Sequence, residues 1–196
     1  MVDGLPGETK LVVLPEPLVE HLKVIARKRG VSLSSFTAEA LEQAVRVDRL
    51  GASLGETVEV FDIHELSREV GAVRIPRSTF DSMILDLYRE NKDGLLGLWG
   101  KAGRWYGEYL RIKLRSEALG VFERALKLSW NLEDVEIKID GLDVKLVLTS
   151  FVMSREMTEL MVSYISGAMV ALGYDVVEED YLRGLAILYY RRAVGR

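Results

Sequence analysis

The amino-acid sequence predicts an α+β protein made of two unequal parts. A short β-prone run and two amphipathic helices account for residues 1–50. A seam with two glycines and a serine follows at residues 50–55 and interrupts the helical periodicity. Beyond residue 75 helical spacing changes to strict alternation and back, which is typical of helices packed on a mostly antiparallel sheet. We therefore expect a module at 1–50, a linker with a possible first strand at 51–74, and a second domain at 75–196.

The N-terminal module begins with the β-prone run Lys10–Leu14, which Pro15 stops. Apolar residues at three- and four-residue spacing then predict an amphipathic helix over Glu16–Arg29, and Gly30 suits the left-handed position that ends it. Ser32 is a good N-cap for a second helix. The apolar face of this second helix consists of Phe36, Ala40, Leu41, Ala44 and Val45.

A lone strand leaves its backbone donors unpaired, so a partner chain must complete the sheet. Val12–Leu18, Arg27–Ser34 and Ala38–Leu41 resemble the strand, the inter-helix turn and the second helix of the ribbon-helix-helix family, over residues 8–48. The resemblance implies a homodimer whose paired strands enter the major groove of double-stranded DNA. It also implies that the N-termini of the second helices contact phosphates.

The strand face that we expect to enter the groove has few of the hydrogen-bonding side chains that recognition of base edges requires. If Val12 and Leu14 face the core, the groove face is Thr9, Leu11 and Val13, of which only Thr9 has a hydrogen-bonding side chain. The residues that we expect to contact DNA are Thr9, Lys10, Leu11, Val13, Lys23, Arg27, Lys28, Arg29, Ser32 and Ser34. The alternative is that the module only dimerises, and that its basic cluster is a solvated helix end complementing the helix dipole.

The larger part reads as helices, hairpin, helix, hairpin. The pattern predicts a strand at Thr57–Ile63, a helical turn at Glu65–Val70, and helices at 75–89, 95–114 and 118–129. Alternation on both sides of Asp140-Gly141 then predicts a β-hairpin. A helix at Glu156–Leu172 and strands at Asp175–Glu179 and Leu185–Arg191 complete the expected domain.

Two segments of this domain resemble the 4-vinyl-reductase-type family. Ser163–Met169, with Leu172–Val176 after it, is similar to the end of that domain, and the glycine-spaced Gly100–Gly107 is similar to its earlier glycine-rich helix. The resemblance implies a domain that senses a small hydrophobic molecule, is often joined to transcription regulators, and is commonly dimeric. Several members carry cysteines that suggest metal binding, and this chain has none, so no metal function is carried over.

A ligand pocket in this domain would be built from aromatic and small residues. The residues that we expect to line it are Trp99, Gly103, Tyr106, Gly107, Ser163 and Gly167. Aromatics at helical spacing more often form core, and Gly167 more often means tight helix–sheet packing than the floor of a ligand pocket. Lys101 and Arg104 could meet an anionic ligand group, or their stems could cover apolar surface while their charges stay in water.

Composition narrows the function classes. The chain has no cysteine and two distant histidines, and it lacks nucleophile-elbow, P-loop and HExxH patterns, so we expect no metal, no cofactor and no enzyme activity. Net charge is −4, but residues 1–50 hold seven basic and seven acidic residues, so the excess lies in the C-terminal part. Sparse amides and many charges suggest a heat-adapted source. No apolar run reaches membrane-spanning length and no signal peptide is evident, which favours the cytoplasm.

The sequence therefore predicts a homodimeric, DNA-binding transcriptional regulator, such as a repressor, with a C-terminal small-molecule-sensing or oligomerisation domain. The first alternative is a non-enzymatic ligand-binding or assembly protein whose N-terminal module only dimerises. An enzyme acting on a hydrophobic substrate ranks last.

Overall fold

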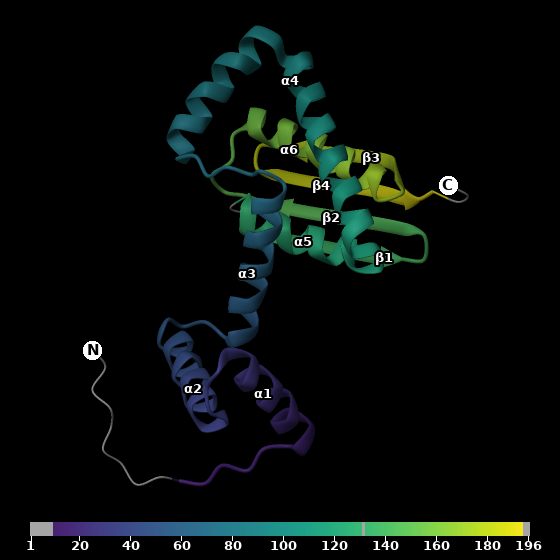
Figure 1. Ribbon diagram of the computed structural model, residues 1–196. Coiled ribbons are helices and arrows are strands. Elements are labelled where there is room, and N and C mark those ends of the chain that lie inside the picture. The colour runs from purple at the N-terminus through teal and green to yellow at the C-terminus, as the bar shows by residue number, and fades with distance from the viewer. Residues whose placement is uncertain (1–9, 131, 194–196) are drawn as a thin grey trace. The chain divides into compact units, whose positions relative to one another are not determined.

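The structure, a computed structural model, describes residues 10–130 and 132–193 and divides into two compact units, Met1–Glu59 and Val60–Arg196. The first unit holds helices α1 (Glu16–Arg29) and α2 (Leu33–Arg49) and the start of α3 (Leu54–Glu69), which continues into the second unit (Figure 1). In the described part of the first unit only Ala26 is a buried hydrophobic residue. This unit therefore has almost no core of its own.

The expected N-terminal ribbon-helix-helix module is wrong for this fold. Residues 10–15 form no strand, and all strands of the described chain lie between Asp134 and Arg192. The described part of the chain gives residues 10–14 no strand to pair with, and an unpaired β-prone run gains no ladder hydrogen bonds. The fold is α+β, with helices first and the sheet at the C-terminal end.

The expected linker strand at Thr57–Ile63 and helical turn at Glu65–Val70 are also corrected, because one helix, α3, covers nearly all of both. Ser53 and Glu56 form a reciprocal capping box, with Ser53 N–H donating to Glu56 Oε2 (2.7 Å) and Glu56 N–H donating to Ser53 Oγ (3.1 Å). Ile63 and Leu66 are then buried on one helical face. Capping and packing outweigh the strand preference of the valines in this segment.

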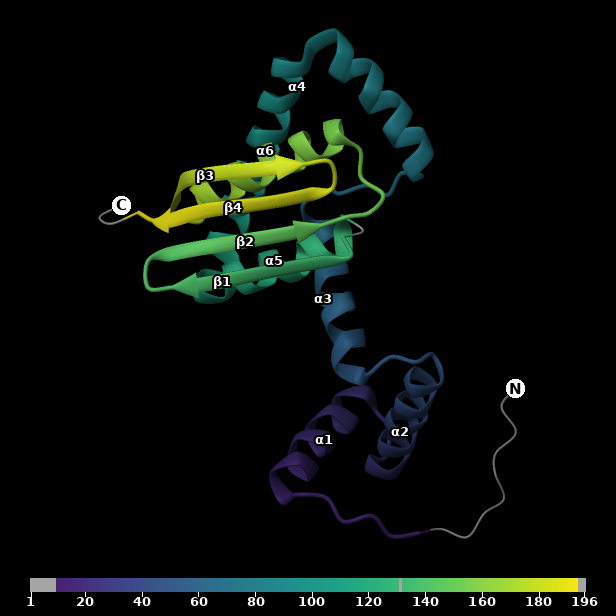
Figure 2. The ribbon, with the colours of Figure 1, turned by 180° about the vertical axis from the view of Figure 1, so that it is seen from behind.

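The second unit packs helices on one face of a four-stranded antiparallel sheet of order β1-β2-β4-β3 (Figures 1 and 2). The strands are β1 (Asp134–Asp140), β2 (Asp143–Thr149), β3 (Tyr174–Leu182) and β4 (Leu185–Arg192). The expected hairpin turn is present, with Gly141 at φ 60°. Side chains alternate on β2 and β4, so Leu146 and Leu188 are fully buried beneath the helices.

Helices α4 (Arg77–Leu114), α5 (Ala118–Ser129) and α6 (Arg155–Ala171), with a short 3-10 turn η1 (Arg115–Glu117), complete this unit. Helix α4 is two helices joined at Asn91, whose backbone is non-helical (φ −152°, ψ 69°). The Asn91 side chain caps the second half by accepting a hydrogen bond from Gly94 N–H at 3.0 Å. The sequence prediction of separate helices at 75–89 and 95–114 reflects this break.

Candidate functional site

The turn between α1 and α2 gathers the cations of the first unit. Arg27, Lys28 and Arg29 form the last turn of α1, and all three side chains are exposed. Gly30 adopts φ 70°, which lets its N–H bond to the Arg27 carbonyl (3.1 Å) and reverses the chain at once. The cations therefore lie immediately before the start of α2.

The first turn of α2 presents backbone donors beside these cations. Ser32 caps the helix, because its Oγ accepts a hydrogen bond from Ser35 N–H at 3.0 Å. Phe36 N–H donates to the Ser32 carbonyl at 3.0 Å. Helix geometry leaves the N–H groups of Leu33 and Ser34 without intrahelical acceptors, so this end of α2 attracts an anion. We call residues Arg27–Ser34 the basic turn.

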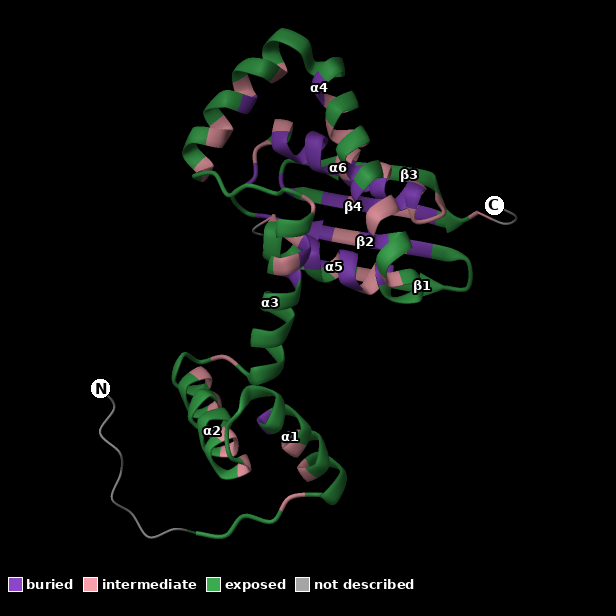
Figure 3. Cartoon of the chain, viewed as in Figure 1, coloured by how far each residue is buried: buried purple, intermediate pink, exposed green. Residues whose placement is uncertain are grey.

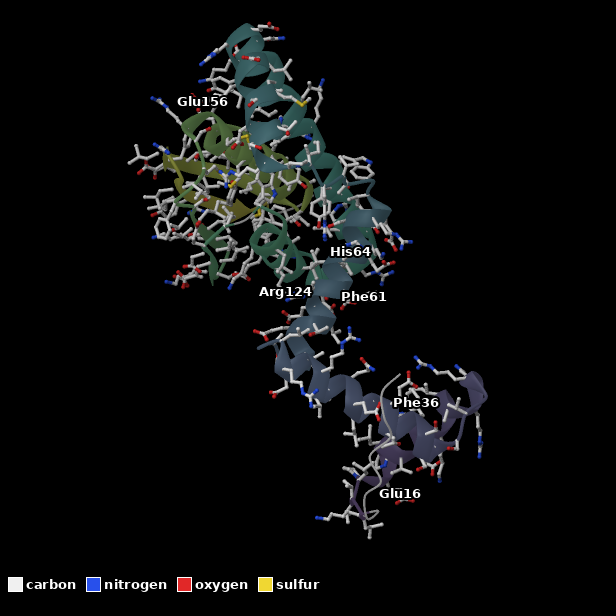
Figure 4. The ribbon with its side chains drawn as sticks, turned by 90° about the vertical axis from the view of Figure 1, so that its left-hand side faces the viewer. Glu16, Phe36, Phe61, His64, Arg124 and Glu156 are labelled. Atoms are coloured by element: carbon white, nitrogen blue, oxygen red, sulfur yellow. The ribbon has the colours of Figure 1, made fainter. Side chains whose placement is uncertain are left out.

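The cations of this region differ in whether they have an interaction partner within the described chain. Lys23 forms an ion pair with Glu20 (2.7 Å), and this bond together with the charge of Lys23 lowers the pKa of Glu20. The Arg29 guanidinium lies 5.1 Å from the centre of the Phe36 ring (Figure 4 labels Phe36). Within the described chain, neither Arg27 nor Lys28 forms an ion pair. These two are the cations best placed to bind phosphate.

The other expected DNA contacts are not brought together with the basic turn by any strand. Lys10 is exposed, and Leu11 and Val13 are 95% and 88% exposed. Thr9 lies outside the described residues. The expected groove face of Thr9, Leu11 and Val13 has no β-ladder to support it in this chain.

In the second unit, the three glycines expected to line a pocket instead let two helices touch. A Cβ built on Gly103 would lie 1.8 Å from the Tyr164 carbonyl oxygen, and one on Gly107 would lie 2.4 Å from that of Ala168. One on Gly167 would lie 2.0 Å from the Gly100 carbonyl oxygen, so Gly167 packs against a helix and not, as expected, against the sheet. These residues therefore place the backbones of α4 and α6 in direct contact.

Ser163 joins the same crossing by donating a hydrogen bond from Oγ to the Leu96 carbonyl at 2.8 Å. Trp99 lies among other rings, with centroids 5.2 Å from Trp130, 6.1 Å from Phe80 and 6.5 Å from Tyr164. Tyr106 stacks on Tyr164, and burial raises the pKa of Tyr106 to about 12. The aromatic residues expected to surround a ligand thus pack against one another.

An open depression of about 320 Å³ lies on the outer side of the same crossing. Its lining residues are Gly97, Gly100, Lys101, Arg104, Ser166, Gly167 and Val170, so Gly167 is shared with the expected pocket. Ser166 Oγ is within 3.0 Å of Tyr190 Oη and bonds to Glu179. Two cations at the rim suit an anionic group better than an apolar ligand. The spacing of Lys101 and Arg104 beside glycines was the sequence signal for this place.

Glu159 on α6 is a buried acid that sequence reasoning missed. Its side chain is 6% exposed and bonds to Lys92 Nζ (2.5 Å), Arg155 Nε (3.3 Å) and the Tyr88 hydroxyl. Burial alone would raise the pKa of Glu159, but the hydrogen bonds from Lys92 and Tyr88 outweigh it and lower the pKa. The sequence signal for this buried acid was its position on a mostly apolar helix, one helical turn before Ser163. Tyr88 and Lys92 lie on either side of Asn91, so their bonds to Glu159 stabilise the kink of α4.

Comparisons with known proteins identify no family for this chain. No family model and no curated protein matches it. Similar solved structures concern heme distortion in the H-NOX family (TM-score 0.39; 68% of this chain, 85% of that one) and heme redox potential set by porphyrin distortion (TM-score 0.36; 67% and 88%). A third concerns the mechanism of H-NOX activation (TM-score 0.36; 66% and 83%). All are 14% identical, and likeness at this level supports no functional conclusion.

The described residues contain neither a cluster suited to a metal ion nor a membrane-spanning helix. No group of three or more histidine or acidic side chains is placed to hold a metal ion in residues 10–130 and 132–193. Over the same ranges, every helix is too short or too polar to cross a membrane.

Proposed function

We propose that the chain is a homodimeric, cytoplasmic DNA-binding regulator without enzyme activity. The basic turn contacts phosphates of double-stranded DNA, and the second unit adds contacts between copies or responds to a small molecule. The single observation that carries the proposal is the basic turn itself. There, Arg27 and Lys28 lie beside the capped N-terminus of α2 without ion pairs in the described chain.

The first unit needs a second copy because a single copy leaves apolar residues of α1 and α2 exposed to water. Leu41 and Val45 lie one turn apart on α2 and are 55% and 52% exposed, and on α1 Leu18 and Val24 are 45% and 49% exposed. A unit of this size with one buried hydrophobic residue in its described part does not offset the conformational entropy of folding by itself. Association of two copies through α1 and α2 would bury these faces and place two basic turns on one DNA duplex.

The contacts available set the kind of DNA binding to expect. Arginine, lysine and backbone N–H groups hold phosphates but read no bases, so affinity should depend on salt and specificity should be modest. The resemblance of the second unit to 4-vinyl-reductase-type domains supports a sensing role. A small molecule can regulate DNA binding only if it binds one arrangement of the dimer better than another.

The test is DNA binding by the full chain over a range of salt concentrations, measured by fluorescence anisotropy on the upstream region of its own gene and on unrelated DNA. The double variant Arg27→Ala with Lys28→Ala should weaken binding to both DNAs. It should also reduce the slope of log affinity against log salt by about 3.6, since the dimer loses four phosphate contacts, two from each copy, and each removes ~0.9.

The matched control changes two exposed cations of the second unit, Arg124→Ala with Lys127→Ala on α5 (Arg124 is labelled in Figure 4). It should leave the DNA affinity and the salt slope unchanged. No binding by the parent chain at low salt, or equal losses in the two double variants, would contradict the proposal.

A second candidate is a non-enzymatic assembly protein whose first unit only dimerises. The observation that favours it is the exposed, wholly apolar pair Leu11 and Val13, whose side chains cannot hydrogen-bond to base edges. This candidate predicts a dimer whose stability and mass are the same with and without DNA, which sedimentation measurements distinguish from the first proposal.

A further inference from the structure

The second half of α4 carries an apolar stripe on the face that points away from α6. Its members, separated by four, three, four and three residues, are Leu98, Ala102, Trp105, Tyr109 and Ile112, which we call the α4 stripe. Leu98 is 64% exposed, Trp105 55% and Ile112 72%. Figure 3 shows exposed residues along this outer side and buried ones toward α6. This spacing is the heptad pattern of helices that pack against another helix.

The α4 stripe is not part of the hydrophobic core, because a different face of the same helix packs against the interior of the unit. Gly103 and Gly107 lie against α6, and Leu110 is fully buried. The stripe is also held in place: Trp105 stacks on Tyr109 with centroids 6.1 Å apart and planes at 19°, and the Tyr109 hydroxyl bonds to Glu69 of α3. A large indole fixed in this way and more than half exposed is suited to contact a partner.

We infer that the α4 stripe binds the α4 stripe of a second copy, antiparallel, with the two-fold axis at Trp105. Leu98 and Ile112 lie seven residues before and after Trp105, so each meets the other residue of the second copy when the helices run in opposite directions. Trp105 meets its own equivalent. The inference rests on the proposed homodimer and adds to it an interface within the second unit.

The charges beside the stripe favour the second copy as the occupant. Lys101 lies four residues before Trp105 and Glu108 three residues after it, on one flank of the helix. In the antiparallel pair each Lys101 faces Glu108 of the second copy, so the interface makes two ion pairs of opposite charge. In the described chain Lys101 has no ion pair, whereas Arg111 pairs with Glu108 at 2.5 Å and orients it. The same surface is thus self-complementary in the spacing of its apolar residues and in charge.

The absence of cysteine from the sequence allows a direct test by disulfide cross-linking in the full chain. Leu98→Cys and Ile112→Cys are made separately, co-expressed with different tags, and oxidised. Antiparallel pairing predicts a disulfide-linked species that carries both tags, and little cross-linking of either variant expressed alone. Each variant chain carries a single cysteine, so no disulfide can form within a chain.

Three further variants complete the test. Lys101→Glu should lower the yield of the mixed cross-link several-fold, and adding Glu108→Lys to the same chain should restore it. Leu128→Cys, an exposed leucine on α5, measures random collision. No mixed cross-link above the Leu128→Cys level, or equal cross-linking by each single variant alone, would overturn the inference, including the case in which another molecule covers the stripe. Because the readout involves no DNA, failure of DNA binding and failure of this interface are separate outcomes.

Discussion

The two units of the chain differ in how they hold their helices. In the second unit, α6 is surrounded: Leu160, Ile165 and Met169 are fully buried, and the glycines of α4 bring a second helix into backbone contact with it. In the first unit, α2 has an equally clear apolar face but not one buried residue. An amphipathic pattern therefore predicts a helix in both cases, and says nothing about whether its partner lies in the same chain.

The largest expected effect lies at the crossing of α4 and α6 in the well-packed unit. Gly103→Ala places a methyl group 1.8 Å from a backbone oxygen, so the two helices must separate. We expect the free energy of unfolding of this unit to fall by at least about 2 kcal/mol, as overpacking usually costs.

Gly97→Ala, two turns earlier on the same helix, is the matched control, because a Cβ there meets nothing within 4 Å. It should be neutral or raise stability by up to ~1 kcal/mol through helix propensity. Urea denaturation followed by circular dichroism compares the two variants. Equal effects would show that helix propensity, rather than the close crossing, sets the response.

The units should also differ in their response to acid. Buried polar or charged residues of the described chain (Ser150, Thr158 and Glu159) all lie in the second unit. Because the pKa of Glu159 is lowered in the folded state, its ion pair stabilises that unit above the unfolded value of about 4.5. The contribution is lost as pH falls through the lower folded value. Glu159→Gln should therefore cost about 1–2 kcal/mol at neutral pH, and the cost should shrink below roughly pH 4.5.

Glu156→Gln, one turn earlier on α6, is the control, since no ion pair of Glu156 is seen within the described ranges (Figure 4 labels Glu156). The measurement is the difference in unfolding free energy between each variant and the parent across the acid range. A Glu159→Gln difference that stays constant with pH would exclude an ion pair as its source.

Local signals in the sequence were sufficient where one segment determined its own structure. Gly30, Ser32 and Asp140-Gly141 mark a helix end, a helix start and a hairpin, and the structure places a left-handed residue, a cap and a turn there. The errors arose where the partner was distant or absent. The β-prone Lys10–Leu14 has no strand to pair with in the described chain. Thr57–Ile63 is helical despite its β-branched residues, because the capping box at Ser53 starts a helix there.

The candidate sites show the same division. The basic turn could be predicted because its cations, its glycine and its cap are neighbours in sequence. The sequence left two roles open for Gly103 and Gly167, a ligand pocket or close packing, because spacing alone does not say whether a glycine faces a ligand or another backbone. Glu159 was missed because its partners Tyr88 and Lys92 lie about seventy residues away in sequence.

The smallest expected effect is the loss of a serine N-cap, an interaction that is present in both units. Ser32 caps α2 by accepting from Ser35 N–H (3.0 Å), and Ser154 caps α6 by accepting from Met157 N–H (3.2 Å). Ser32→Ala and Ser154→Ala should each lower the free energy of unfolding by about 1 kcal/mol.

The two variants should nevertheless differ in thermal unfolding. The midpoint of a unit of fewer than 60 residues should fall by roughly 4–8 °C, and that of the larger unit by roughly 2–4 °C. Differential scanning calorimetry of both variants measures this. Ser32→Ala should move the transition of the first unit and Ser154→Ala that of the second, and the midpoint of the first transition should rise with protein concentration because that unit requires a second copy to bury its apolar faces. Equal shifts in one shared transition would mean that the two units unfold as one.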